Sequence, residues 1–192
     1  MKIETSDLQK LLEAIDNKKL SIPEAIALIN GKNGKIEKKV ATSQAITTDD
    51  VKLTVDYTKT VEQAIADGNY DWKNSDVTAK NFPISPEMIG KKVDISGRLF
   101  HFDRNINSKE AIKEMDSDGC RPAILMELLA LGATHPELQR QFPVVALGSV
   151  WRDSDGNRRV PVLDVGDSGR QLDLGYFDSG WSASYRFLGV RK

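Results

Sequence analysis

Histidine and cysteine, the side chains most often used for acid-base or thiol chemistry, are scarce in this chain, which has two histidines and one cysteine. His101 and Asp103 are two residues apart in a stretch predicted to be a strand. Both side chains would project from one face, and the carboxylate could orient the imidazole. General-base catalysis also needs a substrate pocket, and no serine elbow or thiol partner accompanies the pair. We expect a surface or hydrogen-bonded histidine and predict that the protein is not an enzyme.

The sequence offers no clear metal or cofactor site. The lone cysteine, Cys120, excludes an intrachain disulfide and a thiolate zinc site, and its simplest interpretation is a small buried apolar residue. The segment Asp153–Asn157 (DSDGN) resembles part of a calcium loop, but the downstream glutamate of an EF-hand is missing, so an Asp-Gly-Asn hairpin turn is favoured. Phosphate-binding glycine loops and glycosidase carboxylate pairs are not identifiable either. We predict neither metal nor cofactor.

Charge and hydropathy exclude further classes. The chain has 27 Lys and Arg against 28 Asp and Glu, so no net field favours nucleic acid. Its first twenty residues are studded with charges, unlike a signal peptide, and no stretch is long and apolar enough to span a membrane. We predict a protein that is cytoplasmic when made and does not insert into membranes, with its final location left open.

The N-terminal 30 residues predict a helical hairpin. Ser6 with Gln9 forms a capping box before one amphipathic stretch, and Ser21 with Glu24 repeats the signal before a second, which stops at Asn30-Gly31. Two short helices bury too little surface to be stable alone. They must pack on the rest of the chain, on each other in a homo-oligomer, or on a partner. The polar, lysine-rich residues 31–50 are interpreted as a linker, followed by a main domain at 51–192.

The main domain is predicted to be α+β. It begins with a strand at 51–58 and a short helix ending at Gly68, and a second strand runs through residues 91–103. Asn107, with Glu110, is predicted to cap a helix that ends near Gly119. Pro122 is predicted to open a wholly buried helix that closes at Gly132 and is apolar except for Glu127. No helical period follows, and strands are expected within residues 142–150, 158–164 and 184–192.

Two elements of this layout resemble the C-type lectin fold, in its formylglycine-generating-enzyme-like branch. A glycine-arginine-proline turn before a helix with a glutamate matches Gly119, Arg121, Pro122 and Glu127, although Ala123 replaces the family's threonine. The terminal strand loosely matches at Arg186, Phe187, Val190 and Arg191. The resemblance covers residues 85–192 and implies a C-type lectin-like domain. The branch's oxidase activity needs a reactive cysteine pair, which this chain lacks, and the calcium-dependent sugar motifs of true lectins are missing.

Within this branch, the chain is most similar to the variable proteins of diversity-generating retroelements, whose C-terminal coding segment is rewritten at adenines. Such rewriting yields mainly small, polar and aromatic residues. The segment GYFDSGWSASYRF, residues 175–187, consists almost entirely of them around Trp181, which rewriting cannot produce. The alternative is that Gly, Ser, Asp and Tyr are simply what loops and binding surfaces contain.

The function predicted is therefore a ligand-binding display protein that recognises an unknown protein or cell-surface ligand. Its binding face is predicted to comprise Trp151, Arg152, Asp153, Ser154, Asp155, Asn157, Tyr176, Asp178, Ser179, Ser182, Ser184 and Tyr185. Tyr176 and Tyr185 would be the anchors, unless Tyr185 points into the core. Trp151 is either core or partly exposed, whereas Trp72 and Trp181 are expected in the core. The alternatives are a structural or receptor-binding protein of a phage or mobile element, and an enzyme with an unrecognised site.

Overall fold

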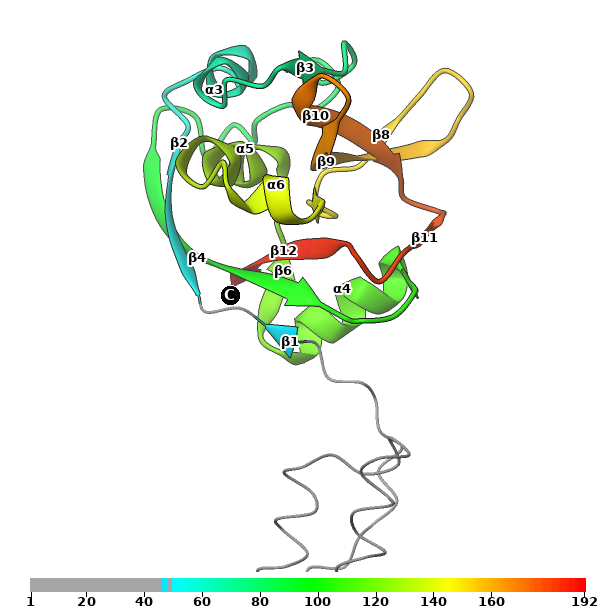
Figure 1. Ribbon diagram of the computed structural model, residues 1–192. Coiled ribbons are helices and arrows are strands. Elements are labelled where there is room, and N and C mark those ends of the chain that lie inside the picture. The colour runs from blue at the N-terminus through cyan, green and yellow to red at the C-terminus, as the bar shows by residue number, and fades with distance from the viewer. Residues whose placement is uncertain (1–45, 48–49) are drawn as a thin grey trace, which may run out of the picture. The chain divides into compact units, whose positions relative to one another are not determined.

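The structure is a computed structural model that describes residues 46–47 and 50–192. The chain divides into two units, Met1–Thr42 and Ser43–Lys192. The predicted helical hairpin at 1–30 and most of the predicted 31–50 linker lie outside the described residues. The second unit contains both helices and strands, with strands dominating, and is therefore α+β (Figure 1). Its helices are α3 (Val61–Asp67), α4 (Ser108–Ser117), α5 (Leu125–Thr134) and α6 (Leu138–Gln141).

One large sheet organises the second unit. Its strand order is β1-β4-β12-β7-β9-β10-β3, with β2 paired to β4, β6 to β12 and β8 to β9. A separate small ladder joins β5 (Ile106–Asn107) to β11 (Gly180–Trp181). The strands of the large sheet are β1 (Ile46–Thr47), β2 (Val51–Asp56), β3 (Trp72–Lys73), β4 (Lys92–His101), β6 (Cys120–Pro122), β7 (Val144–Val145), β8 (Trp151–Arg152), β9 (Arg158–Gly166), β10 (Gly169–Tyr176) and β12 (Arg186–Arg191).

The sheet separates two core clusters, because consecutive strand residues point to opposite faces. Phe187 lies in one cluster and Leu188 in the other, and Val162 and Leu163 divide in the same way. One cluster is covered by α3 and α5, and the other by α4 and the β5–β11 ladder. Both faces of the central strands are therefore buried. The C-terminal strand β12 runs between β4 and β7, which ties the chain end into the core.

The predicted start of α4 at Asn107 and the predicted end of α3 at Gly68 are confirmed. Asn107 caps α4, with its side chain accepting a hydrogen bond from the backbone N–H of Glu110 at 2.9 Å. Helix α3 ends at Gly68, as predicted, and Thr60 caps it through a reciprocal capping box with Gln63. Both caps satisfy N–H groups that the first helical turn leaves without partners.

The buried helix is confirmed, but its predicted start is wrong. Helix α5 begins at Leu125, and Pro122 belongs instead to β6, where it pairs with Gly189. Proline tolerates this place because an edge strand needs no N–H from it. The side chain of Glu127 accepts a hydrogen bond from the backbone N–H of Ile124 at 2.8 Å, and this contact begins the helix.

Four elements after Gly132 were not predicted: α6, β8, β10 and β11. Strands β8 and β11 have two residues each, too few for an alternating pattern. Strand β10 gives a weak strand signal, because Gly, Arg, Gln and Asp surround its two buried leucines, Leu172 and Leu174. Helix α6 is a single short turn, too brief to show a helical period. The three strands that were predicted there are present as β7, β9 and β12.

The tryptophans and the cysteine occupy different environments. Trp181 is buried at 5% exposure, and Cys120 is fully buried, as predicted. The expectation for Trp72 is wrong, because this side chain is 41% exposed on β3. Trp72 lies in a two-residue strand at the sheet edge, where it has a neighbour on one side alone.

Replacing Leu163 with alanine should lower the free energy of unfolding by about 2–5 kcal/mol. Leu163 is 1% exposed and lies against α5 in the centre of the sheet, so the substitution leaves a cavity. Urea unfolding followed by circular dichroism measures the change. Val165→Ala on the same strand is the control, because Val165 is 48% exposed and should change stability by less than about 0.5 kcal/mol.

Candidate binding surface

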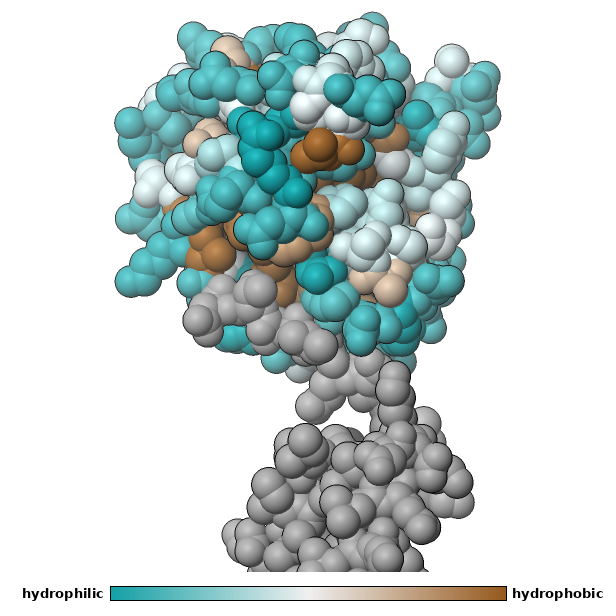
Figure 2. All heavy atoms as spheres, in the orientation of Figure 1, coloured by the Kyte–Doolittle hydropathy of each residue, from teal (hydrophilic) through white to brown (hydrophobic). Residues whose placement is uncertain are grey.

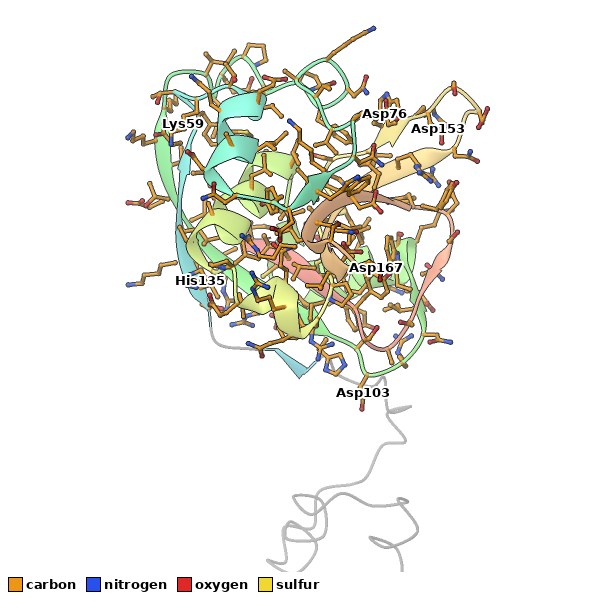
Figure 3. The ribbon with its side chains drawn as sticks, turned by 45° about the horizontal axis from the view of Figure 1, so that its top comes forward. Lys59, Asp76, Asp103, His135, Asp153 and Asp167 are labelled. Atoms are coloured by element: carbon orange, nitrogen blue, oxygen red, sulfur yellow. The ribbon has the colours of Figure 1, made fainter. Side chains whose placement is uncertain are left out.

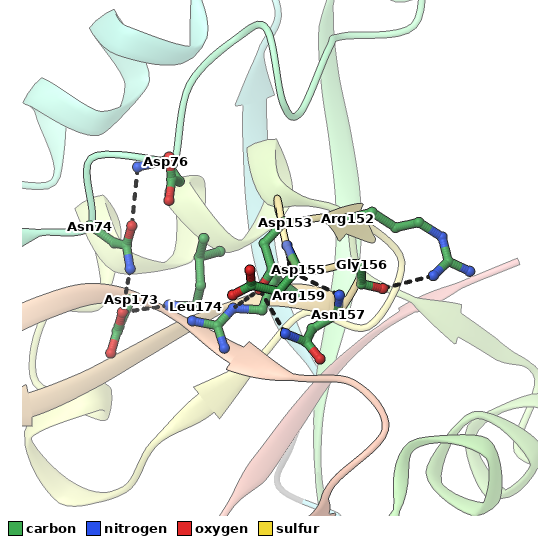
Figure 4. Close-up of polar contacts among 10 residues, drawn as sticks. All are labelled: Asn74, Asp76, Arg152, Asp153, Asp155, Gly156, Asn157, Arg159, Asp173 and Leu174. Carbon is green, nitrogen blue, oxygen red and sulfur yellow. Dashed lines mark hydrogen bonds and ion pairs between the residues drawn. The ribbon is translucent and has the colours of Figure 1, made fainter.

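The loop between β8 and β9 is folded around one carboxylate. Asp153 accepts hydrogen bonds from the backbone N–H of Asp155 at 3.1 Å and of Asn157 at 2.8 Å (Figure 4). Gly156 has a φ of +83°, which side chains rarely adopt, and Arg152 donates to its carbonyl at 3.0 Å. Burial alone would raise the pKa of Asp153, but the hydrogen bonds from Asn157 and Asp155 lower it below its ordinary value. The predicted hairpin turn is therefore confirmed, with its aspartate used to hold the loop.

A second segment is tied to this hairpin by an ion pair. Arg158 donates through Nε to Asp178 Oδ2 at 2.9 Å and through Nη2 to Oδ1. Its guanidinium also lies over the ring of Phe177, 4.3 Å from the ring centre. The hydrogen bonds and charge of Arg158 hold the pKa of Asp178 below its usual value. This two-point contact orients the turn after β10 against the start of β9.

Three side chains form a row across β8, β9 and β10. Trp151 pairs with Arg159, and Arg159 pairs with Tyr176, so all three project from one face of the sheet. The Arg159 guanidinium stacks on the Tyr176 ring, 3.8 Å from its centre. Trp151 is half-buried, with its ring 6.3 Å from that of Phe82, whereas Tyr176 is 50% exposed. The row thus runs from the core to the surface, and Tyr176 is its accessible end.

The structure therefore brings together, through direct contacts, the residues predicted on the hairpin and those directly after β10. Seven of them are exposed: Arg152, Ser154, Asp155, Asn157, Tyr176, Asp178 and Ser179. On the face shown in Figure 2, apolar residues form only small, separated areas among hydrophilic ones. Recognition at such a surface would depend on hydrogen bonds and a tyrosine anchor rather than on a broad apolar patch.

The segment Ser182–Tyr185 makes its contacts elsewhere. The hydroxyls of Ser182 and Ser184 are hydrogen-bonded to each other at 2.8 Å, and the Ala183 carbonyl lies 2.9 Å from Nε2 of His101. Asp103, which follows the strand that carries His101, and Asp153 of the hairpin lie at opposite ends of the view in Figure 3. A single surface formed by the hairpin and this segment stays a prediction.

Tyr185 combines features of both interpretations made from the sequence. Its ring packs against Trp181 with ring centres 5.2 Å apart, at the margin of the core. The side chain is nevertheless only half-buried. Burial, and then the charges of Asp164 and Asp173, raise the pKa of its hydroxyl. Tyr185 thus faces a group of carboxylates on β9 and β10.

The two arginines of β9 are the residues that sequence reasoning missed. Arg158 and Arg159 are adjacent and therefore point to opposite faces, so each fixes a different part of the surface. Their predicted strand carried the signal, since strand alternation places consecutive side chains on opposite faces. Their partners, Asp178 and Tyr176, lie about twenty residues further along the chain, and only pairing of β9 with β10 brings them close.

His101 and Asp103 were predicted to lie on one strand, but the strand contains only His101. His101 is the last residue of β4, and Asp103 lies beyond the strand with a φ of +50°. The closest approach of the two side chains is 3.9 Å, longer than a hydrogen bond. Among residues 46–47 and 50–192, no three His, Cys, Asp or Glu side chains are grouped to hold a metal ion. No helix within the described part of the chain is long and apolar enough to cross a membrane.

Comparison of the chain with protein-family models, with curated proteins and with solved structures finds no match.

Proposed function

We propose that this chain is a ligand-binding display protein and not an enzyme. The observation that carries the proposal is the construction of the surface at Asp153–Asn157 and Tyr176–Ser179. Exposed polar residues and one exposed tyrosine lie at the ends of β9 and β10, whose inward-facing side chains are buried. Contacts from Arg158 and Arg159 hold the two segments together. A rigid base with exchangeable surface residues suits recognition of varied ligands.

The proposal includes a C-type lectin-type fold for the second unit. Three features support it: a buried helix with a buried glutamate, a glycine-arginine-proline segment before it, and a terminal strand in the middle of the sheet. Gly119 adopts a φ of +74°, a conformation that favours glycine at this place. The proposal also includes a protein or cell-surface ligand, synthesis in the cytoplasm, and homo-oligomerisation through the N-terminal residues.

The proposal extends to diversification of the C-terminal coding segment by a retroelement. The DNA next to the gene tests it directly. We expect a reverse-transcriptase gene and a near-copy of the segment encoding residues 152–185, with differences from the copy concentrated at adenines. Related genes that differ at random positions, with no such copy nearby, would contradict this part of the proposal and leave ligand binding to be tested separately.

A display surface should tolerate substitution of its exposed residues. We expect the triple variant Ser154→Ala, Asp155→Ala and Ser179→Ala to keep its free energy of unfolding within about 1 kcal/mol of the parent, because these side chains are exposed. Thermal and urea unfolding measure this. Asp153→Ala is the contrasting variant, since it removes the acceptor that holds the loop, and it should lower the stability more than the triple variant does. Unfolding of the triple variant would contradict the proposal.

A further inference from the structure

A second surface lies on the face of β9, β10 and β3 opposite to the side chains of Arg159 and Tyr176. Asp164 pairs with Gln171, and Gln171 pairs with Trp72, so the three side chains form one row across three strands. Adjacent strands are about 4.8 Å apart, which places the ends of the row about 10 Å from each other. Asp164 and Gln171 are partly exposed and Trp72 is 41% exposed.

A second carboxylate lies in the next row. Asp173 pairs with Val162, two residues from Asp164 on the same face. Asp173 Oδ1 accepts hydrogen bonds from Asn74 Nδ2 at 2.9 Å and from the backbone N–H of Leu174 at 2.7 Å (Figure 4). Its partners are neutral, so the charge of Asp173 is not compensated by them. Two aspartates of like charge therefore share this face.

Asp164 is the incompletely satisfied member of the pair. Its Oδ1 is buried and has no hydrogen-bond partner among residues 46–47 and 50–192. Burial, and then the charge of Asp173, raise the pKa of Asp164 to about 6. A buried acceptor with no donor, beside a like charge, costs stability. Such a cost is typical of groups whose partner is a ligand.

Aromatic rings lie on both sides of the carboxylates. Trp72 ends the row on β3. Tyr185 lies on the other side of β9, because its neighbour Arg186 pairs with Val144 of β7, and Val144 pairs with Leu163 of β9. Within the part of the chain that the structure describes, Asp173 and Tyr185 are the titratable groups that face Asp164, and Asn74 adds a neutral amide. The face offers acceptors and negative charge between flat apolar surfaces.

The ligand that complements this arrangement is a flat cation with several N–H donors. A guanidinium group meets each requirement, because it donates to two carboxylates in one plane and stacks on aromatic rings. An anionic ligand would be repelled, and a neutral hydroxyl would leave the two charges uncompensated. We propose that Asp164 and Asp173, flanked by Trp72 and Tyr185, bind an arginine side chain of a partner protein. This site is distinct from the hairpin surface and does not depend on it.

The probe for this site is N-acetylarginine methylamide, and the matched control is its citrulline analogue, which has the same shape without the charge. The full-length chain is titrated while NMR follows the indole N–H of Trp72 and the carboxyl carbon of Asp164. The arginine probe should shift the Trp72 signal and lower the pKa of Asp164 by at least about 1, as a neighbouring positive charge does. The citrulline probe should do neither. Equal effects of both probes, or none, would overturn the proposal.

Two pairs of variants locate the binding. Asp164→Asn should weaken binding of the arginine probe at pH 7.5 by about tenfold or more, because a charged hydrogen bond is lost. Asp167→Asn removes the same charge from the exposed turn between β9 and β10 (Figure 3), and should weaken binding of the arginine probe less than about twofold. Trp72→Ala should weaken binding, whereas Val165→Ala, of similar exposure, should not. Equal losses within either pair would count against the site.

The pH dependence supplies an independent measurement. The arginine probe binds the ionised form of Asp164. The affinity for the probe should therefore fall as the pH drops through about 6, the pKa of Asp164 in the protein without the probe. In Asp164→Asn this fall should vanish. If the free full-length chain already shows an ordinary pKa for Asp164, another group of the chain occupies the site and the proposal fails.

Discussion

Replacing Glu127 with alanine should lower the free energy of unfolding by about 2–4 kcal/mol, because its carboxylate is buried while the side chain of its ion-pair partner, Arg121, is 42% exposed. Glu127 is 1% exposed. Arg121 donates to both of its carboxylate oxygens, at 2.6 and 3.0 Å, and the backbone N–H of Ile124 donates a third hydrogen bond. Alanine would remove the acceptor for all three donors and leave a cavity beside α5.

Urea unfolding of three variants separates the ion pair from the cavity. Arg121→Met should also be strongly destabilising, because it leaves a buried carboxylate without its charged partner. The double variant Arg121→Met with Glu127→Ala should cost less than the sum of the two single substitutions, since neither charge is then left alone. Glu137→Gln, on an exposed glutamate of the next turn, should change stability by less than about 0.5 kcal/mol. Additive losses would contradict the pairing.

Replacing Arg170 with methionine should lower the free energy of unfolding by about 3–5 kcal/mol. Arg170 is 5% exposed and donates to the carbonyls of Gly68 and Gly132, at 2.7 and 2.6 Å, and to Oε1 of Gln139. These acceptors belong to the ends of α3 and α5 and to α6. Each acceptor left buried without a donor costs about 1–3 kcal/mol, partly offset because methionine buries no charge.

The matched control for Arg170→Met is Arg140→Met. Arg140 lies on α6 but is exposed, so its loss should change stability by less than about 0.5 kcal/mol. Hydrogen exchange gives a second readout, since backbone amides of α3, α5 and α6 should lose protection together in the Arg170 variant. A loss confined to β10 would contradict the role of Arg170 as the link between three helices.

The hairpin turn of the proposed display surface was predicted because its elements are local. Asp153, Gly156 and Asn157 lie within five residues, so the residues that form the turn are neighbours in the sequence. The same holds for the cap at Asn107. Arg158 and Arg159 were missed because their partners, Asp178 and Tyr176, lie just after β10 and at its last residue, and the mixed polar composition of β10 gives a weak strand signal.

The sequence alone determined the helix cap at Asn107, the hairpin turn, the buried helix and the strands β7, β9 and β12, because each rests on residues close together along the chain. Only the tertiary structure decided that Trp72 is exposed, that Pro122 lies in a strand, and that Arg170 links three helices. It also placed Trp72 beside Gln171, about a hundred residues away. Strand pairing over such distances depends on the packing of the whole sheet, which local propensity does not encode.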